Sequence, residues 1–256
     1  MKEGYTVLAL PDIHVTTIPT RRGWEDGTAD ALWAALEFGK DFRPDETIIM
    51  GDFIEFDIIS NYTENNYILR EGRRLKHDFE LANQILDIID KFTKEKKVFL
   101  IGNHDARLAS WIAANPQVEG LIGLDYNLHL EKRGYKVVEE GRAYRVGHAN
   151  FIHGWYWNKY HAAKTVTEMG DNIFYGHVHD VQAYTKANYE QKPIVGQSLG
   201  CLCDLNPSYR RNKPNRWVNA FGVFFFDSKG YFTYYVPIII NGKFTWCGKT
   251  YSRKRR

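Results

Sequence analysis

The sequence predicts an α/β protein, because short apolar runs alternate with helix-like segments and end in polar residues. Helix-like segments separate the first three of these runs, which is the pattern that builds a parallel sheet. Ligands of α/β proteins bind beyond the carboxyl ends of strands, so the polar residues that follow the runs are expected to meet in space. Five such runs lie at residues 7–10, 47–50, 98–100, 149–152 and 172–175, and Asp, Asn or His follows each.

The N-terminal half is expected to alternate strands with helices. Residues 5–10 are apolar, as expected for a strand buried on both faces. Apolar residues from Leu32 to Gly39 share one helical face, and Thr28 or Asp30 is the expected cap. Helical spacing from Leu81 to Phe92 predicts a second helix packed on the sheet. The expected order is strand 5–10, loop 15–26, a helix that Arg43-Pro44-Asp45 ends, strand 47–50, polar loop 53–79, helix 81–92 and strand 98–100.

The second half is expected to become richer in hairpins. Asn115-Pro116 ends a predicted short helix, and Gly141 is the expected turn between two strands. Asn158 is the expected cap of the next helix, which contains His161. The later β-like runs should complete a second sheet. The expected order is helix 106–114, irregular chain 117–134, strands 136–140 and 143–152, a helix from about 159 to 169, strand 173–175, and β-like runs at 182–188, 193–197, 218–226 and 231–240.

One domain is expected to span residues 1–256, because this length supports a core that needs no disulfide staples. Its expected parts are the polar motifs at 12–179, a β-rich portion at 180–248 and a basic tail at 249–256. The formal net charge is only +3, yet five of the last eight residues are Lys or Arg. Such a tail either contacts nucleic acid through phosphates or is simply a solvated end.

A cytoplasmic location without membrane contact is expected. No run approaches the roughly 18 apolar residues of a membrane span, and residues 1–20 lack the pattern of a secretory signal. The three cysteines are odd in number and do not suit a disulfide framework. Cys201 and Cys203 have no second Cys or His pair nearby in the sequence, so packing inside a strand is the preferred interpretation over a zinc site. Oligomeric state is left open by the sequence.

The polar residues at the strand ends have the chemistry of metal ligands. Carboxylate, amide oxygen and imidazole together suit borderline divalent ions, of which Mn²⁺ is the first expectation and Fe²⁺, Zn²⁺ and Ni²⁺ are alternatives. Singly, each histidine would be an ordinary loop or core residue, but five of the nine histidines fall in these motifs. The motifs are Asp12-x-His14, Gly51-Asp52, Gly102-Asn103-His104-Asp105, His153 and Gly176-His177-x-His179.

This order of motifs resembles the calcineurin-like metallophosphoesterase family. The resemblance implies a four-layer αββα sandwich, with two mixed β-sheets flanked by helices. It also implies a two-metal site, in which a carboxylate bridges the ions and a bridging hydroxide attacks the phosphate ester. Carried over to this chain, one metal would take Asp12, His14, Asp52 and His179, and the other would take Asp52, Asn103, His153 and His177.

The resemblance also implies a catalytic pair beside the metals. His104 resembles the catalytic histidine of the family, which as an imidazolium would stabilise the transition state or protonate the leaving oxygen. Asp105 is expected to orient the His104 ring. Many members of the family have a second Asp three residues after the Gly-Asp aspartate. This chain has Glu55 at that position, which would need a longer arm to give the same support.

The metal motifs do not select the phosphate ester, because this fold class includes phosphomonoesterases, cyclic nucleotide phosphodiesterases and nucleases. Three segments mix aromatic or amide side chains with basic ones, at residues 53–79, 155–157 and 210–217. Such surfaces favour a phosphodiesterase that acts on nucleic acid or a nucleotide, like the nuclease-like branch of the family, which includes phage-encoded forms. A phosphomonoesterase or cyclic nucleotide phosphodiesterase is the enzymatic alternative, and a non-catalytic binding module is the third. His161 is a further candidate for reaching substrate phosphate.

Overall fold

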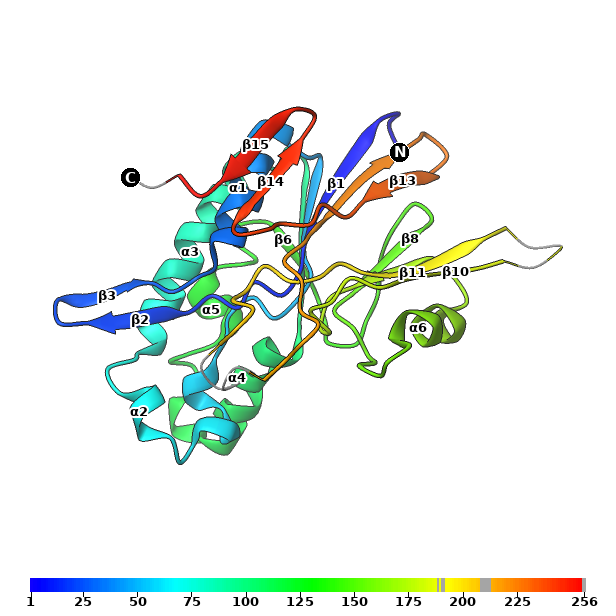
Figure 1. The fold of residues 1–256 in the computed structure, drawn as a ribbon. Helices are drawn as coiled ribbons and strands as arrows, with labels where there is room; N and C mark the ends of the chain where they lie inside the picture. Colours follow the sequence, from blue (N-terminus) through cyan, green and yellow to red (C-terminus); the bar gives the residue numbers. More distant parts are fainter. Residues whose placement is uncertain (188, 190–191, 208–212, 255–256) are drawn as a thin grey trace.

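Two mixed β-sheets pack face to face and carry helices on their outer faces in the computed structural model of the chain (Figure 1). The structure describes residues 1–187, 189, 192–207 and 213–254. The order of the layers is helix, sheet, sheet, helix, as the fold class predicted from the sequence requires.

The first sheet has six strands, and its parallel half leads to the polar motifs. Strands β1, β4, β5 and β6 run parallel to one another. On the other side of β1, β12 pairs antiparallel with β1 and β13 pairs antiparallel with β12. In sheet order the strands are β13 (Phe232–Tyr235), β12 (Gly222–Phe226), β1 (Tyr5–Leu10), β4 (Glu46–Ile49), β5 (Lys96–Leu100) and β6 (Tyr135–Val138).

The second sheet has five strands and a parallel centre. Strands β8, β9 and β11 are parallel to each other, and β7 and β10 pair antiparallel at the edges. In sheet order the strands are β10 (Ala183–Lys186), β11 (Ile194–Ser198), β9 (Ile173–Tyr175), β8 (Ala149–Ile152) and β7 (Tyr144–Val146).

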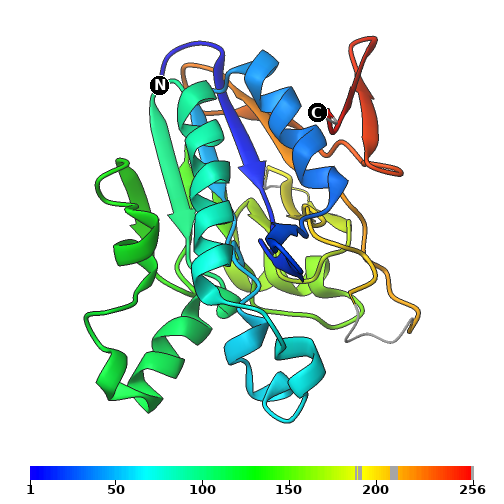
Figure 2. The same cartoon turned by 90° about the vertical axis from the view of Figure 1, so that its left-hand side faces the viewer.

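Helices cover the outside of each sheet. Helices α1 (Asp30–Phe42) and α3 (Leu75–Phe92) lie side by side on the first sheet (Figure 2), and α6 (His161–Met169) covers the second. Gly39 lets α1 approach α3, because a β-carbon there would lie 2.7 Å from the Phe92 ring. The shorter helical segments are η1 (Asp57–Ile59), η2 (Asn61–Thr63), α2 (Tyr67–Arg70), α4 (Asn103–Ala114), η3 (Pro116–Val118) and α5 (Leu124–Leu128).

Alternation of side chains along the strands divides the core into three layers. Leu8 and Leu10 of β1 pack against the helices of the first sheet, whereas Val7 and Ala9 face the second sheet. On the second sheet, Phe151 and its neighbours complete the layer between the sheets, and the opposite face packs on α6. Strand period therefore explains why the central strands carry apolar residues on both faces.

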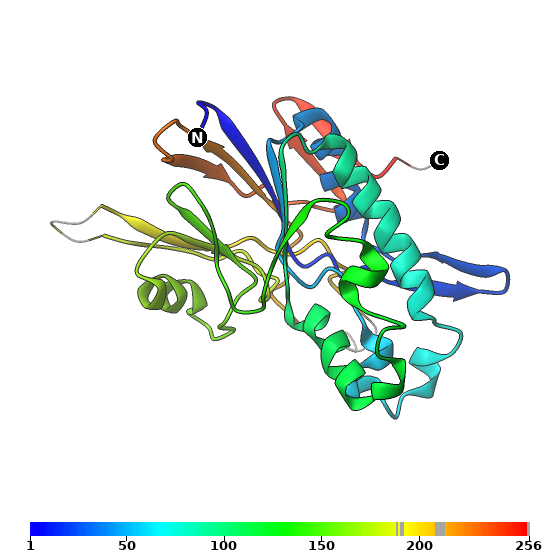
Figure 3. The same cartoon turned by 180° about the vertical axis from the view of Figure 1, so that it is seen from behind.

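Expectations about strands were wrong in two regions, and the expected caps were wrong too, since Ala29 and Tyr160 occupy the N-cap positions of α1 and α6. Residues 15–26, expected to be a loop, contain a hairpin of β2 (Thr17–Thr20) and β3 (Gly23–Asp26). The two strands expected around Gly141 do not pair, because β6 joins the first sheet and β7 joins the second (Figure 3). The hairpin in this region is β7–β8, and Gly147 at its turn has φ +53°. Local sequence signals a turn but not the sheet that each strand joins.

The C-terminal segment is a hairpin that packs on α1 rather than a free tail. Strands β14 (Lys243–Trp246) and β15 (Lys249–Ser252) pair antiparallel, and Phe244 and Tyr251 bury their rings against Phe38. The basic residues of β15 and of the segment after it contact acids near α1. Lys249 pairs with Asp41, Arg253 with Asp26 and Asp30, and Lys254 with Glu37, whereas Arg255 and Arg256 lie outside the described residues.

Among the residues that the structure describes, no helix is both long and apolar enough to cross a membrane.

Candidate metal centre

The carboxyl ends of five strands from both sheets converge on one site. Strands β1, β4 and β5 of the first sheet and β8 and β9 of the second each end just before a polar motif. Asn103 begins α4, so its amide side chain is held at a helix N-terminus. The residues brought together in this way are Asp12, His14, Asp52, Asn103, His153, His177 and His179.

A first donor group consists of Asp12, His14, Asp52 and His179, all buried, whose donor atoms lie within 4.8 Å of one another. The Nε2 atoms of His14 and His179 are 3.2 Å apart, and His179 Nε2 is 3.3 Å from Asp12 Oδ1. Two neutral imidazoles that face each other through nitrogen lone pairs need a proton or a cation between them. The donor set therefore fits a divalent ion.

A second donor group consists of Asp52, Asn103, His153 and His177. Donor atoms of Asp52, His153 and His177 again lie within 4.8 Å of one another. The amide oxygen of Asn103 is 3.0 Å from His153 Nε2 and 2.9 Å from His177 Nδ1. His153 Nε2 and His177 Nδ1 are themselves 3.2 Å apart, so this group also presents converging lone pairs.

Asp52 is common to both donor groups. Its Oδ2 atom lies 3.3 Å from His153 Nε2 in the second group and 3.8 Å from His14 Nε2 in the first. The surrounding imidazoles keep the Asp52 carboxylate ionised: burial opposes the charge, but His153 and His104 hold the pKa well below its usual range. A carboxylate between two such groups can bridge two cations.

The same charges act on the histidines. Burial opposes protonation of the His153 ring, but Asp52 and Asp12 raise its pKa to about 10. Burial likewise opposes protonation of His14, and Glu55, Asp52 and Asp12 raise its pKa to about 9. The carboxylates therefore create a strongly negative potential, which favours any cation at this position.

The backbone of the motifs is under strain and close-packed. Five of the candidate ligands have left-handed φ values, at Asp12 (+45°), His14 (+49°), Asp52 (+48°), His177 (+68°) and His179 (+60°). Such conformations are costly for residues with a β-carbon and cluster at functional sites. The motif glycines admit close approach, since a β-carbon at Gly102 would lie 2.3 Å from Asp52 Oδ1 and one at Gly176 would lie 2.2 Å from Asp12 Oδ2.

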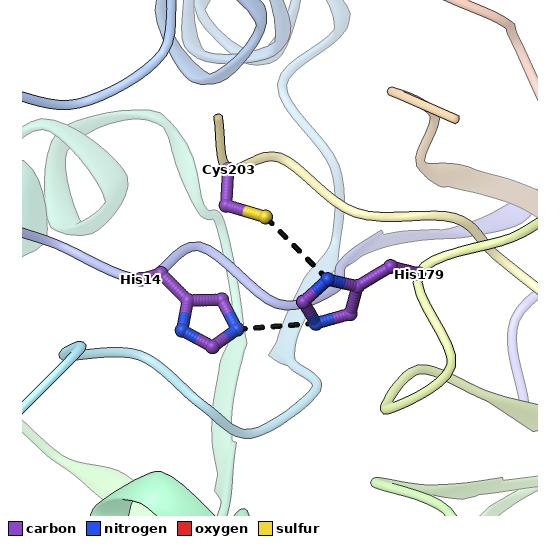
Figure 4. Close-up of side chains that lie close together, drawn as sticks. All are labelled: His14, His179 and Cys203. Atoms are coloured by element: carbon purple, nitrogen blue, oxygen red, sulfur yellow. Dashed lines mark hydrogen bonds between the residues drawn. The ribbon is translucent and has the colours of Figure 1, made fainter. Parts of the chain in front are cut away.

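Outer contacts hold the distal nitrogen of three imidazoles. Glu55 Oε2 lies 2.6 Å from His14 Nδ1, so Glu55 reaches the donor groups with its longer side chain. The Met50 carbonyl oxygen lies 2.9 Å from His153 Nδ1. Cys203 Sγ lies 3.7 Å from His179 Nδ1 (Figure 4). Such partners orient a metal-binding ring and set its tautomer.

Cys203 is a contact that the sequence analysis missed. Cys201 and Cys203 are buried, as expected for packed cysteines, but Cys203 also faces the site. It lies 24 residues from His179, and no local motif links the two. The only signal in the sequence was a pair of cysteines in a β-rich segment.

His104 lies at the edge of the donor groups and is supported by Glu55 rather than by Asp105. The His104 Nδ1 atom is 2.8 Å from the Glu55 carbonyl oxygen, and its Nε2 is 4.0 Å from Asp52 Oδ2. Burial lowers the pKa of His104 to about 4.

The Asp105 carboxylate serves the backbone instead of the His104 ring. It accepts hydrogen bonds from the amides of Gly102 at 3.0 Å and Phe53 at 3.1 Å. Burial and the nearby Asp52 charge raise the pKa of Asp105 to about 7. Asp105 thus joins the loop after β4 to the start of α4, and this positions both Asp52 and His104.

Other candidates from the sequence have partners within the protein. Both ring nitrogens of His161 are engaged, Nδ1 at 2.7 Å from the Tyr175 hydroxyl and Nε2 at 3.0 Å from Asp180 Oδ1. Arg73, in the polar segment 53–79, pairs with Asp57 and contacts Thr16 and Asp78. These contacts engage the Arg73 guanidinium, whereas Arg74 and Lys76 of the same segment are exposed. Arg210, Arg211 and Asn212 lie outside the described residues.

A family model described as calcineurin-like phosphoesterase matches residues 5–181. The matched range contains every candidate ligand and both members of the expected catalytic pair. The comparison with curated proteins finds no match.

Proposed function

The chain belongs to the calcineurin-like phosphoesterase family, and from this premise we propose that it hydrolyses phosphodiester bonds of nucleic acid or nucleotides with two divalent cations. The observation that carries the proposal is the position of Asp52 between two donor groups. Membership of the family makes the chain a metal-dependent phosphoesterase. The preference for diesters over monoesters is the more specific part of the proposal.

The proposed ligands divide as the two donor groups do. Asp12, His14 and His179 would hold one ion, Asn103, His153 and His177 would hold the other, and Asp52 would be a ligand common to both. Mn²⁺ is the proposed metal, because imidazole, carboxylate and amide oxygen together suit borderline ions. When bound, the two ions acidify a water and neutralise the phosphoryl oxygens.

His104 is the proposed acid in this site. Its Nδ1 faces the Glu55 carbonyl oxygen and therefore carries the proton of the neutral ring, which leaves Nε2 free to take a second proton. A bound phosphate anion would raise the pKa of His104. The ring could then donate a proton from Nε2 to the leaving oxygen, a role that is worth about 10²–10⁴ in rate.

The diester preference is supported by side chains around the site. Trp157 is exposed beside His177, and Trp217 packs against His179. Aromatic rings and guanidinium groups are the groups that recognise bases joined to a phosphodiester. The described members of the basic tail are paired with acids near α1, so they do not enter the proposal.

The test compares Mn²⁺-dependent hydrolysis of bis(p-nitrophenyl) phosphate and p-nitrophenyl phosphate by the wild type, Asp52→Asn and Asp41→Asn. Asp41 is an exposed acid at the end of α1 and serves as the matched control. We expect diester hydrolysis by the wild type and Asp41→Asn, and its loss in Asp52→Asn. Preference for the monoester would replace the diester assignment by a phosphomonoesterase, and full activity of Asp52→Asn would refute the bridging role.

A further inference from the structure

A cavity with two tryptophans in its wall lies beside the proposed metal centre. Its volume is about 470 Å³, which lies within the range of small-molecule sites. Its wall includes His177, whose Nδ1 atom faces the amide oxygen of Asn103 in the second donor group. A phosphate held at the donor groups would therefore place its ester substituent near this cavity.

Trp157 forms one side of the cavity and is unusually exposed for a tryptophan. It follows β8 in the turn between His153 and α6, and 78% of its surface is accessible to solvent. Its ring centroid lies 6.1 Å from that of His177. An exposed ring in this position offers a flat surface on which an aromatic ligand can stack.

Trp217 forms another part of the wall and approaches the second histidine of the same turn. Its ring centroid lies 4.3 Å from that of His179. The two tryptophans come from segments 60 residues apart and both contact the Gly-His-x-His turn. The cavity is therefore built from separate parts of the chain that meet only at the site.

The polar groups of the wall can bind a charged heteroaromatic ligand. Arg216 is exposed and makes no ion pair with any acidic residue in the described part of the chain, so its guanidinium is available. Asp180 lines the cavity with its carboxylate 3.0 Å from His161 Nε2. The carboxylate has acceptor capacity for an exocyclic amino group.

We propose that this cavity binds a nucleobase of the substrate, stacked on Trp157, while the phosphodiester lies at the metal centre. The inference rests on the proposed function and names its substrate class, a nucleoside phosphodiester. Stacking on an aromatic ring tolerates any base, because every base has a π-face. Arg216 supplies a positive charge for the sugar-phosphate.

The first experiment compares two diesters with the same leaving group, adenosine 5′-(p-nitrophenyl phosphate) and methyl p-nitrophenyl phosphate, with Mn²⁺. The readout is the ratio of their kcat/KM values. We expect Trp157→Ala to lower this ratio by about tenfold and Trp157→Phe to retain most of it, because phenylalanine preserves a stacking surface. Tyr160→Ala is the control, since Tyr160 is an exposed aromatic residue of the same turn that does not line the cavity.

An unchanged ratio in Trp157→Ala would overturn the subsite, even if both diesters are hydrolysed well. A fall of the ratio in Tyr160→Ala as large as that in Trp157→Ala would also overturn it, because the effect would then belong to the whole turn. Parallel assays of a single-stranded oligoadenylate and the mononucleotide ester distinguish a base within nucleic acid from one in a free nucleotide. The inference requires that Trp157→Ala hydrolyses the faster-cleaved of these two substrates more slowly than the wild type does.

A binding measurement keeps the subsite testable if the proposed function fails. Adenosine 5′-monophosphate and ribose 5-phosphate carry the same phosphate and differ by the base. Calorimetric titration of the Mn²⁺-loaded protein should give at least tenfold tighter binding of the nucleotide, and Trp157→Ala should remove that advantage. Equal affinities in the wild type would refute the nucleobase subsite independently of any hydrolysis.

Discussion

The Glu55 carboxylate lies 2.6 Å from Nδ1 of His14, and the backbone carbonyl of the same residue accepts from the ring of His104. One residue therefore orients a proposed metal ligand and the proposed acid. Phe56, the next residue, has a left-handed φ of +48°, which turns the chain immediately after these two contacts.

Glu55→Gln should weaken one metal site more than the other. The amide lacks the charge that faces His14, and loss of such an outer partner typically costs about 10- to 100-fold in metal affinity. Calorimetric titration with Mn²⁺ should show two unequal sites in the variant. The exposed Glu64→Gln is the control, and wild-type affinity at both sites in Glu55→Gln would contradict the role.

Cys203→Ala should also weaken the site that contains His179. The alanine leaves His179 Nδ1 without its sulfur partner in a buried position. Cys203→Ser should retain more of the affinity than Cys203→Ala, because a hydroxyl can still bond the ring. Mn²⁺ titration of both, with the exposed Cys247→Ala as control, checks this. Equal affinities for Ser and Ala variants would reduce Cys203 to a packing residue.

Gly102→Ala should disrupt the centre, because the added methyl would lie 2.3 Å from both Asp52 N and Asp52 Oδ1. Overpacking of this kind costs about 1–3 kcal/mol of stability or more, and here it also displaces a bridging carboxylate. We expect lost Mn²⁺ binding and a lower Tm. Gly123→Ala is the control, since its nearest neighbour would be 3.6 Å away and its φ is −179°. Normal metal binding by Gly102→Ala would show that Asp52 moves freely.

The stability of the metal-free protein should depend on Asp78. Burial raises the pKa of Asp78 to about 6, against opposing contacts from Thr17 and Arg73. The folded state therefore holds this proton more tightly than the unfolded chain, and the resulting stability is present at low pH and is lost as pH rises through about 6.

The comparison for Asp78 is with Asp78→Asn, which cannot ionise. Between pH 5 and pH 8 the wild type should lose about 1 kcal/mol more of its free energy of unfolding than the variant, measured in urea. The exposed Asp87→Asn should follow the wild type. Parallel pH profiles for wild type and Asp78→Asn would place the pKa of Asp78 near its ordinary value.

Replacement of Arg253 and Lys254 by Ala should leave the salt dependence of any nucleic-acid binding unchanged. Their charges face Asp26, Asp30 and Glu37. Arg216→Ala should instead reduce the slope of log K against log[salt] by about 1 if it contacts a phosphate. Filter binding to a single-stranded oligonucleotide at several salt concentrations measures both, and a flatter slope in the tail variant would restore the tail as a contact.

Residue order alone was enough to predict where the strands that carry the polar motifs end. Apolar runs followed by Asp, His or Asn predicted the five strand ends, and parallel strands of one sheet bring their ends to the same edge. The family match over residues 5–181 confirms the family that these motifs indicated. The two mixed sheets with outer helices confirm the predicted fold class.

Only the tertiary structure decided which groups support the donor atoms and which surface adjoins them. Asp105 follows His104 in sequence, yet its carboxylate accepts hydrogen bonds from the backbone amides of Gly102 and Phe53. Cys203 and Trp217 reach the site from beyond the matched range. Local periodicity determines strands and helices, whereas contacts between distant residues depend on how the two sheets pack, and no single stretch of sequence contains that information.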